Sequence, residues 1–301
     1  GVDITASGSY SEEDTPSDHT AYKLVVKGLS GGHSGMDINK GLGNANKLMN
    51  RILYKSYQNF GLRVANIDGG GLRNAIPRES NAAIALPPTS DDQFKKHLAE
   101  MTEVLKSEHG FTDPNLTVSI EPFPTPNKVM NEDHQNQLSA AIYSAHNGIY
   151  RMSPEIPDLV QTSNNVARVI VGDGEYQVLC LTRSSVDTEK YDLANALESC
   201  FAGLNGVVTQ SGDYPGWQPR PSSDVVNTMR ELYVEMYKEE PHVMACHAGL
   251  ECGILGTNYP DMDMVSFGPN IRGAHSPDEK VQISSVQKYW KYTLNALERI
   301  G

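Results

Sequence analysis

In the first third of the chain, hydrophobic and polar residues repeat every two positions in some segments, as in a strand, and every three to four positions in others, as in a helix. The predicted elements, in order, are a strand at Ala21–Leu29, a helix at Asn39–Tyr57, strands at Leu62–Ile67 and Asn81–Leu86, a helix at Asp91–His109 and a strand at Leu116–Glu121. This βαββαβ order is that of the split-βαβ, ferredoxin-like unit, in which two helices cover one face of an antiparallel sheet.

The same order begins again after the proline-rich stretch at residues 122–126. The elements predicted there are a helix at Glu132–Tyr150, strands at Leu159–Val171 and Tyr176–Ser184, a helix at Thr188–Leu204 and a strand at Val207–Ser211. A tight Gly172-Asp-Gly174 turn between the two central strands is a hairpin signal. We therefore expect two copies of one architecture, at residues 20–122 and 127–212, with no clear leading strand in the second copy.

The last 89 residues are predicted to be part of a layered α/β domain. The elements are helices at Ser223–Glu239, Leu250–Leu255 and Ser284–Ile300, and strands at His242–Cys246 and Met262–Phe267. Because two strands do not make a stable parallel sheet, residues 213–301 are interpreted as the C-terminal half of a domain whose other half lies upstream of Gly1. We expect an open apolar face there, with self-association, swapping or partial disorder as its result.

Composition narrows the range of partners. The net charge is −12 and no basic block is present, which argues against nucleic acid and anionic membranes as partners. The apolar stretches run only a few residues, which excludes a membrane span. The four cysteines form no CxxC pair and are interpreted as buried thiols in a reducing cytoplasm.

Two histidines lie in loops that could expose a side chain for catalysis or ligand binding. His33 lies in Gly28-Leu-Ser-Gly-Gly-His-Ser-Gly35, where glycines let a backbone turn aim one imidazole into open space. His275 follows a predicted strand, at the edge where α/β sheets place their sites. Each is also compatible with a plain exposed loop histidine, and one histidine alone cannot hold a metal.

Six motifs, in chain order, carry a resemblance to a known family. They are GLSGGHSGMDINKGLGNANKL, GLRNAIPRES, VQTSNNVARV, LTRSSVD, CHAGLECG and GPNIRGAHSPDEKV. Over essentially its whole length the chain resembles the bacterial aminoacyl-histidine dipeptidases, also called Xaa-His or cytosol non-specific dipeptidases, which are carnosinase-like di-zinc exopeptidases. The resemblance implies a catalytic domain with two zinc ions and an inserted lid domain, doubled in this subfamily so that one chain imitates a lid dimer.

The resemblance also implies roles for individual residues. His33 matches a lid histidine that stabilises the oxyanion, and Arg183 fits the arginine that binds the substrate's C-terminal carboxylate. Asn74 matches a polar lid residue, although a turn residue is an equal alternative for it, as a surface cation is for Arg183. His247 and Glu251 match a substrate loop, where helix capping is the alternative. His275 matches the last zinc ligand.

The remaining zinc ligands and the general base of the family are expected before Gly1. The predicted fold class is therefore α+β and α/β: residues 1–19 as a linker from the missing segment, a duplicated ferredoxin-like lid at 20–212, and the C-terminal half of a zinc-exopeptidase domain at 213–301. We expect a cytoplasmic dipeptidase fragment that is inactive alone and binds no zinc tightly. The alternative is a stand-alone ferredoxin-like module that binds a small molecule or dimerises.

Overall fold

A computed structural model describes residues 1–220, 223–247, 251–272 and 279–300. The chain divides into two compact units, of which the first contains Gly1–Gly216 with Cys246–Gly249 and the second contains Trp217–Ala245 with Leu250–Gly301. His275 lies outside the described residues. No helix in the described ranges is long and apolar enough to cross a bilayer.

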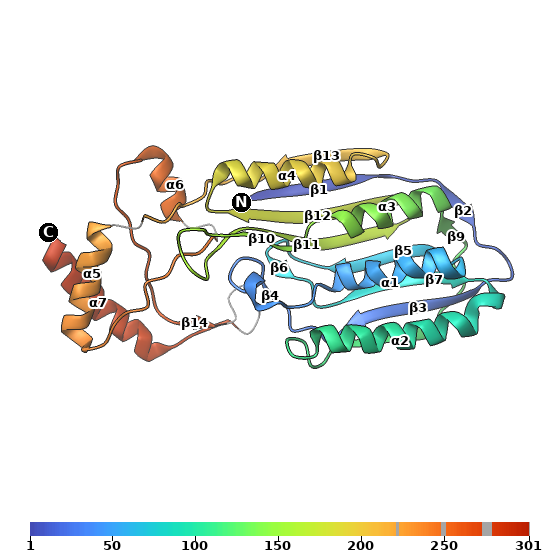
Figure 1. Cartoon of the computed structure of the whole chain (residues 1–301), viewed down its shortest axis with the longest axis horizontal. Helices are drawn as coiled ribbons and strands as arrows, with labels where there is room; N and C mark the ends of the chain where they lie inside the picture. The colour runs from blue at the N-terminus through green and yellow to red at the C-terminus, as the bar shows by residue number, and fades with distance from the viewer. Residues whose placement is uncertain (221–222, 248–250, 273–278, 301) are drawn as a thin grey trace. The chain divides into compact units, whose positions relative to one another are not determined.

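The first unit is built on one nine-stranded antiparallel sheet (Figure 1). Its strands are β1 (Val2–Ser9), β3 (Thr20–Lys27), β5 (Arg63–Gly70), β7 (Ser80–Leu86), β8 (Thr117–Pro122), β10 (Gly148–Met152), β11 (Val160–Gly172), β12 (Glu175–Ser184) and β13 (Gly206–Ser211). The sheet order is β13-β1-β12-β11-β5-β7-β3-β8, with β10 paired to β11. Two short ribbons accompany it, one of β2 (Glu12–Asp14) with β9 (Lys128–Met130) and one of β4 (Gly32–His33) with β6 (Ala75–Ile76).

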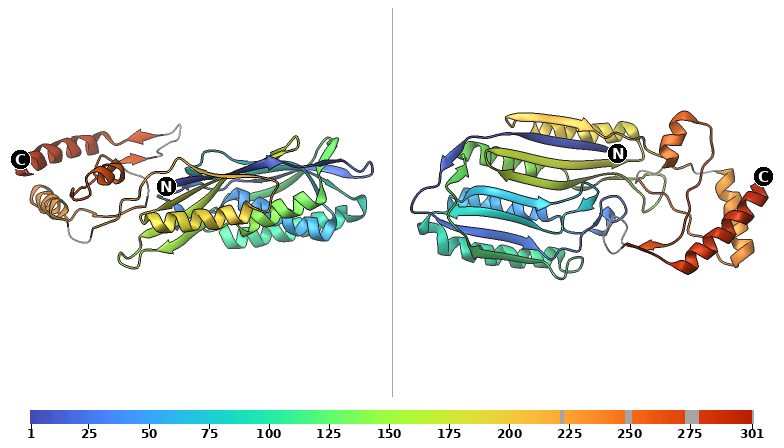
Figure 2. Two further views of the ribbon diagram at one scale, coloured as in Figure 1. Left: turned by 90° about the horizontal axis from the view of Figure 1, so that it is seen from above. Right: turned by 180° about the vertical axis from the view of Figure 1, so that it is seen from behind.

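Four helices cover one face of this sheet, as the edge view in Figure 2 shows. They are α1 (Ala45–Phe60), α2 (Asp91–His109), α3 (Glu132–Ser144) and α4 (Asp187–Phe201), with short 3₁₀ turns η1 (Ile38–Lys40) and η2 (Pro88–Ser90). The core lies between helices and sheet, where Ile52, Phe94 and Phe201 are almost completely buried. Each such side chain contributes about 1.5–3 kcal/mol to the stability of the fold.

The sheet consists of two equivalent halves. The first half follows β3-α1-β5-β7-α2-β8 and the second half follows β1-α3-β11-β12-α4-β13. In each half the spatial order of the four strands is 4-1-3-2, which is the ferredoxin-like arrangement. The α+β class and the large antiparallel sheet expected from periodicity are confirmed. The assignment of residues 213–301 to half of a catalytic domain stays a prediction.

The N-terminal residues differ from the linker predicted at 1–19. Val2–Ser9 form β1, which pairs with β12 on one side and β13 on the other. The reason is visible in the sequence, because Val2, Ile4 and Ala6 alternate with polar residues and are all at most 1% exposed. β1 therefore serves as the leading strand of the second half, although it precedes the whole first half in the sequence.

Two helices are shorter than their apolar patterns predict. The helix expected from Asn39 begins at Ala45, because Gly41 adopts a left-handed φ of 70° and the Asn44 side chain caps α1. The helix expected to reach Tyr150 ends at Ser144, where Lys47 Nζ donates to three carbonyls at the end of α3. The residues that follow form the edge strand β10.

The two halves meet where β5 pairs with β11, between Gly70↔Arg168 and Ile67↔Val171. Gly70 has a φ of 77°, and a Cβ there would collide with the Ala167 carbonyl oxygen. A polar network crosses the same seam, since Asn44 Nδ2 donates to Asn165 Oδ1 at 3.3 Å and to the Val166 carbonyl at 3.1 Å. The seam is therefore a close backbone contact reinforced by buried amides.

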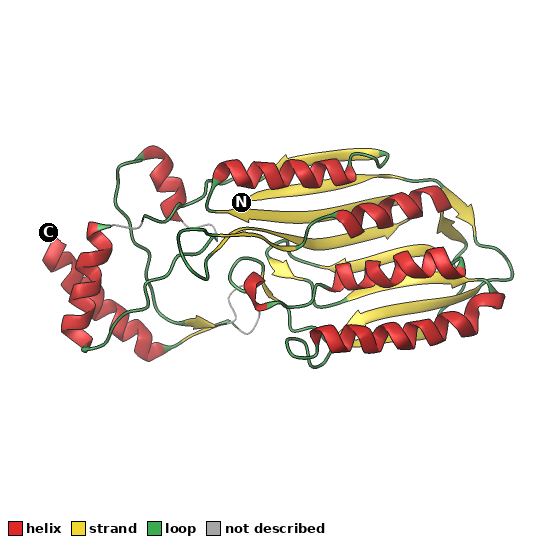
Figure 3. Cartoon of the chain, in the orientation of Figure 1, coloured by secondary structure: helices red, strands yellow, loops and turns green. Residues whose placement is uncertain are grey.

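The second unit contains α5 (Asp224–Tyr237), α6 (Glu251–Asn258), β14 (Ile271–Arg272), β15 (Lys280–Val281) and α7 (Ile283–Ile300). Met229 and Leu232 of α5 pack with Tyr292 and Ala296 of α7. The strands predicted at 242–246 and 262–267 are wrong: both segments are loops (Figure 3) and pair with no strand in the described ranges. An apolar run without a hydrogen-bonding neighbour has nothing to hold it as a strand.

One face of α7 is apolar and exposed. Its side chains, spaced three or four positions apart, are Ile283, Val286, Trp290, Leu294 and Leu297, and they are 39–75% exposed. A stripe at this spacing is a packing surface in ordinary helices. Self-association through it stays a prediction.

We predict that Gly70→Ala destabilises the first unit by about 1–3 kcal/mol, because the backbone conformation is left-handed and the added methyl group meets the Ala167 carbonyl. Gly71→Ala is the matched control, since a Cβ at that position has no atom within 4 Å. The free energy of unfolding of both variants is measured by urea denaturation, monitored by circular dichroism. Equal midpoints for the two variants would contradict the importance of the close approach.

Candidate functional site

The glycine-framed turn holds the His33 ring in a defined orientation. His33 belongs to β4, which pairs with β6 so that His33 lies opposite Ala75. Its Nδ1 accepts hydrogen bonds from the backbone N–H groups of Gly35 and Met36, each at 3.1 Å. Because Nδ1 is occupied as an acceptor, the neutral ring carries its hydrogen on Nε2. His33 therefore presents an N–H donor to its surroundings.

Asp37 stabilises the same turn from within. Its Oδ2 accepts the His33 backbone N–H at 2.7 Å and its Oδ1 pairs with Lys40. Burial alone would raise the pKa of Asp37, but the bonds from Lys40 and from the His33 backbone lower the pKa overall. The carboxylate is thus charged and holds the turn closed.

Asp113 fixes both ends of the loop that contains His33. This carboxylate is 1% exposed, and its two oxygens accept the backbone N–H groups of Ser30 and Gly43, each at 2.8 Å. The Thr112 hydroxyl donates to it as well, at 2.8 Å. Since residues 30 and 43 bracket the His33 turn, one side chain from the α2–β8 connection sets the position of the whole loop.

Arg183 reaches the His33 turn from the second half of the sheet. The side chain lies on β12 and the residue is only 6% exposed. Its Nε donates to Ser34 Oγ at 3.3 Å and its Nη1 donates to the Tyr214 hydroxyl at 2.7 Å. No carboxylate in the described ranges forms an ion pair with it. A buried cation without a counter-ion is costly, so the guanidinium is suited to receive an anion.

Asn74 lies beside the same turn. Its carbonyl accepts the Ser34 backbone N–H at 2.8 Å. The neighbouring Arg73 anchors this loop to the second half, because Nη1 donates to the carbonyls of Ile4 at 3.1 Å and Cys180 at 3.0 Å. Ser34, next to His33 in the chain, thus contacts both the Asn74 carbonyl and the Arg183 side chain, so the cluster spans both halves.

His247 is the fourth predicted site residue in this cluster. Its Nε2 is 2.8 Å from Ser163 Oγ, and Ser163 is the cross-strand partner of Arg183. The residue is 5% exposed. Burial, followed by the positive charge of Arg183, lowers the pKa of His247 to about 4. The ring is therefore neutral at physiological pH.

The remaining two predicted residues are not among the described residues of the first unit. Glu251 is the exposed first residue of α6 in the second unit. His275 lies outside the described residues. Over the described ranges, no group of three or more His, Cys, Asp or Glu side chains is arranged to hold a metal ion. The residues described here thus do not form a zinc site.

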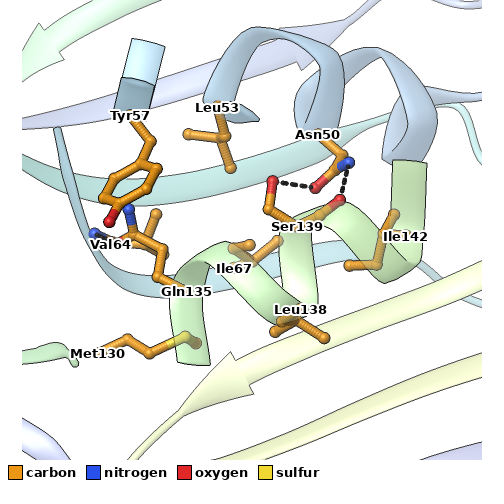
Figure 4. A pocket seen from close by; sticks show the side chains of 10 residues that line it. All are labelled: Asn50, Leu53, Tyr57, Val64, Ile67, Met130, Gln135, Leu138, Ser139 and Ile142. Carbon is orange, nitrogen blue, oxygen red and sulfur yellow. Dashed lines mark hydrogen bonds between the residues drawn. The ribbon is translucent and has the colours of Figure 1, made fainter. Parts of the chain in front are cut away.

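A small cavity lies elsewhere, between α1, α3 and β5 (Figure 4). Its volume is about 20 Å³, which suits a water molecule rather than a substrate. Asn50 and Ser139 exchange hydrogen bonds across it. None of the predicted site residues lines this cavity, so it belongs to the packing of the two halves.

Sequence reasoning did not single out four residues that hold the cluster together: Ser34, Asp113, Ser163 and Tyr214. Ser34 and Ser163 lie inside quoted motifs, but their partners are distant in sequence. Tyr214 lies in the DYPGW stretch, which is typical of a domain boundary. Asp113 looks like an ordinary turn residue before proline. Only the three-dimensional contacts reveal their roles.

The comparisons with known proteins agree with the motifs. A family model described as a peptidase dimerisation domain matches residues 24–113, which include most of the first half. The cytosol non-specific dipeptidase of Escherichia coli (strain K12) is 38% identical over all 301 residues. The chain is homologous to part of a dipeptidase. It spans 62% of the length of that relative.

A solved structure leads to the same homology. The aminoacylhistidine dipeptidase from Vibrio alginolyticus is 39% identical and superposes with a TM-score of 0.89, covering 99% of this chain and 61% of the dipeptidase. The resemblance to aminoacyl-histidine dipeptidases predicted from the six motifs is confirmed.

We predict that Asp113→Asn loosens the His33 loop. An amide accepts with one atom only, so one of the two backbone N–H groups loses its partner, at a cost of about 1–2 kcal/mol. Hydrogen exchange at the Ser30 and Gly43 amides should accelerate by about 5- to 30-fold. Asp92→Asn is the control, because Asp92 is exposed at the start of α2. Unchanged exchange in the Asp113 variant would show that the loop holds itself.

We also predict that His247 titrates near pH 4 in the folded protein, against about 6.5 in an unfolded chain. Because its folded pKa is lowered, the stability that the neutral, buried His247 contributes to the folded protein is fully present above pH 6.5 and is lost as the pH falls from 6.5 toward 4. The His247 Cε1–H signal in NMR spectra reports the titration, with the urea-unfolded chain as control. A folded value near 6.5 would contradict the buried placement.

Proposed function

We propose that this chain supplies the substrate-binding lid of a dipeptidase, in which Arg183 binds the terminal carboxylate of the substrate and His33 donates to the carbonyl oxygen of the bond to be cleaved. The observation that carries the proposal is the buried Arg183 guanidinium, which has no ion-pair partner in the described structure. It donates a hydrogen bond to Ser34, the residue that follows His33 in the chain. The relatives named above are dipeptidases, and every dipeptide ends in a carboxylate.

Arg183 suits a carboxylate better than a lysine would. A guanidinium presents five N–H donors in a plane and matches the two oxygens of a carboxylate. Two donors, at Nε and Nη1, are engaged by hydroxyl groups of Ser34 and Tyr214. The positive charge itself is not neutralised by these partners, so it is available to an anionic ligand.

His33 suits a reacting carbonyl because its donor hydrogen is on Nε2. When a peptide bond is hydrolysed, negative charge develops on the carbonyl oxygen, and a fixed N–H donor stabilises that charge. The Gly35 and Met36 amides fix the tautomer, and Asp37 and Asp113 fix the loop. The donor therefore needs no rearrangement as the charge forms. His247, neutral and beside Arg183, would contact the carboxyl end of the same substrate.

Other parts of the proposal rest on the homology. Zinc binding through His275, substrate contact by Glu251 and Asn74, and a preference for dipeptides ending in histidine stay predictions. So do the cytoplasmic location, which agrees with a relative named as a cytosol dipeptidase, and the expected inactivity of residues 1–301 alone.

The alternative is a module that dimerises, which the description of the matched family model favours. In this chain, however, the β5 edge of the first half is already paired with β11 of the same chain. That edge is therefore already occupied and cannot pair with a strand of a second copy. We therefore favour the substrate-binding lid, because strand pairing between two copies would need another edge of the sheet, such as β8 or β13.

We predict that Arg183→Met weakens binding of the dipeptide Gly-His by about 10- to 100-fold, because a charge-assisted bidentate contact is lost. Binding of the Gly-His amide, which has no carboxylate, should change little. Arg51→Met is the matched control, since Arg51 pairs with Glu108 on the surface. NMR titration measures all of these affinities, and circular dichroism verifies folding. Equal loss for both ligands, or no loss, would refute the carboxylate site.

A further inference from the structure

Tyr214 contacts the candidate carboxylate site but has no counterpart among the residues predicted from sequence. Its hydroxyl accepts a hydrogen bond from Arg183 Nη1 at 2.7 Å, while Ser34 Oγ accepts from Nε at 3.3 Å. These two bonds hold the guanidinium at two of its three nitrogen atoms. A guanidinium on a flexible side chain needs such partners, because it otherwise samples many rotamers.

The chemistry of Tyr214 matters as much as its position. Burial raises the pKa of its phenol, although the neighbouring Arg183 opposes that shift, so the hydroxyl stays neutral at physiological pH. A carboxylate at this place would form an ion pair with Arg183 and compete with an anionic ligand. A phenol orients the guanidinium and leaves its charge uncompensated.

The backbone of Tyr214 is held by a buried lysine. Lys190 is 1% exposed and lies between the carboxylates of Asp187, at 2.9 Å, and Asp213, at 2.7 Å. Its Nζ donates to the Tyr214 carbonyl at 3.0 Å. Asp187 also accepts the Gly216 backbone N–H at 3.0 Å. Asp187 and Lys190, at the start of α4, therefore hold the segment around Tyr214 at the Tyr214 carbonyl and at the Gly216 backbone N–H.

Gly1, directly before strand β1, also contacts Tyr214. The Tyr214 backbone N–H donates to the Gly1 carbonyl at 2.9 Å. A Cβ at Gly1 would collide with the Tyr214 hydroxyl and ring, so the ring fits there only because residue 1 has no side chain. Tyr214 is thus constrained by β1, by α4 and by its own segment.

We infer that Tyr214 is a positioning residue that orients Arg183 for a ligand carboxylate, with Lys190 holding Tyr214 in place. The inference deepens the proposed function and rests on it, because it assigns to Tyr214 a role that acts through Arg183. It predicts that removing one oxygen atom from Tyr214 lowers selectivity for carboxylates without altering the fold.

The test compares Tyr214→Phe with Tyr191→Phe. Tyr191 is a matched control because its hydroxyl donates to Asp213 at 2.7 Å in the same segment but does not contact Arg183. NMR titration of each variant with Gly-His and with Gly-His amide gives the ratio of the two affinities. We expect this ratio to fall by about 10- to 20-fold in Tyr214→Phe, the lower end of the range for loss of one hydrogen bond to a charged group, and to stay unchanged in Tyr191→Phe.

A spectroscopic readout and a double variant complete the test. The Arg183 Nε–H signal, assigned with Arg183→Met, should shift and exchange faster with water in Tyr214→Phe. In the Arg183→Met background, Tyr214→Phe should have no further effect on the ratio. Equal ratios in the two tyrosine variants, with Arg183→Met still lowering carboxylate binding, would overturn the positioning role alone. An unchanged ratio in Arg183→Met would instead overturn the proposed function.

Discussion

The antiparallel pairing of β5 with β11 joins two halves that the chain builds from separate segments. The turn around His33 comes from the first half and Arg183 from the second, yet Ser34 Oγ lies 3.3 Å from Arg183 Nε. That contact exists only if the two halves meet in one register, because a slip of one residue turns every side chain to the other face. Gly70 against the Ala167 carbonyl and the Asn44 amide against Val166 fix this register. The site is therefore a consequence of the seam.

Charge is distributed unevenly around that seam. Most cations of the first unit are paired, as Arg63 is with Glu13 and Lys190 with two aspartates. Arg183 has only hydroxyl partners, and His247 beside it is neutral since burial lowers its pKa. A folded protein that leaves one buried guanidinium without a counter-ion sacrifices stability at that place, and such sacrifices are found at functional sites.

Much of the fold was predictable because local patterns determine it. The helix at Asp91–His109 is found with the predicted bounds, and Asp173 and Gly174 form the predicted tight hairpin with positive φ at both residues. The leading strand of the second half was missed because periodicity identifies a strand but not its partner. Likewise, the glycines around His33 are a local signal, whereas Tyr214 and Asp113 act only through bonds to residues distant in sequence. Arg183 was found through its motif, and its missing counter-ion only through the structure.

The placement of β1 has a consequence for how the first unit folds. Residues 20–122 form the first half as one continuous segment, so that half is complete as soon as β8 is made. The second half is interrupted: β1 precedes the first half in the sequence, and its partners β12 and β13 follow that half. Pairings of such long sequence separation are slow to form. During synthesis, the alternating apolar strand Val2–Ser9 therefore has no sheet partner until β12 is made, and the half that carries Arg183 closes after the first half.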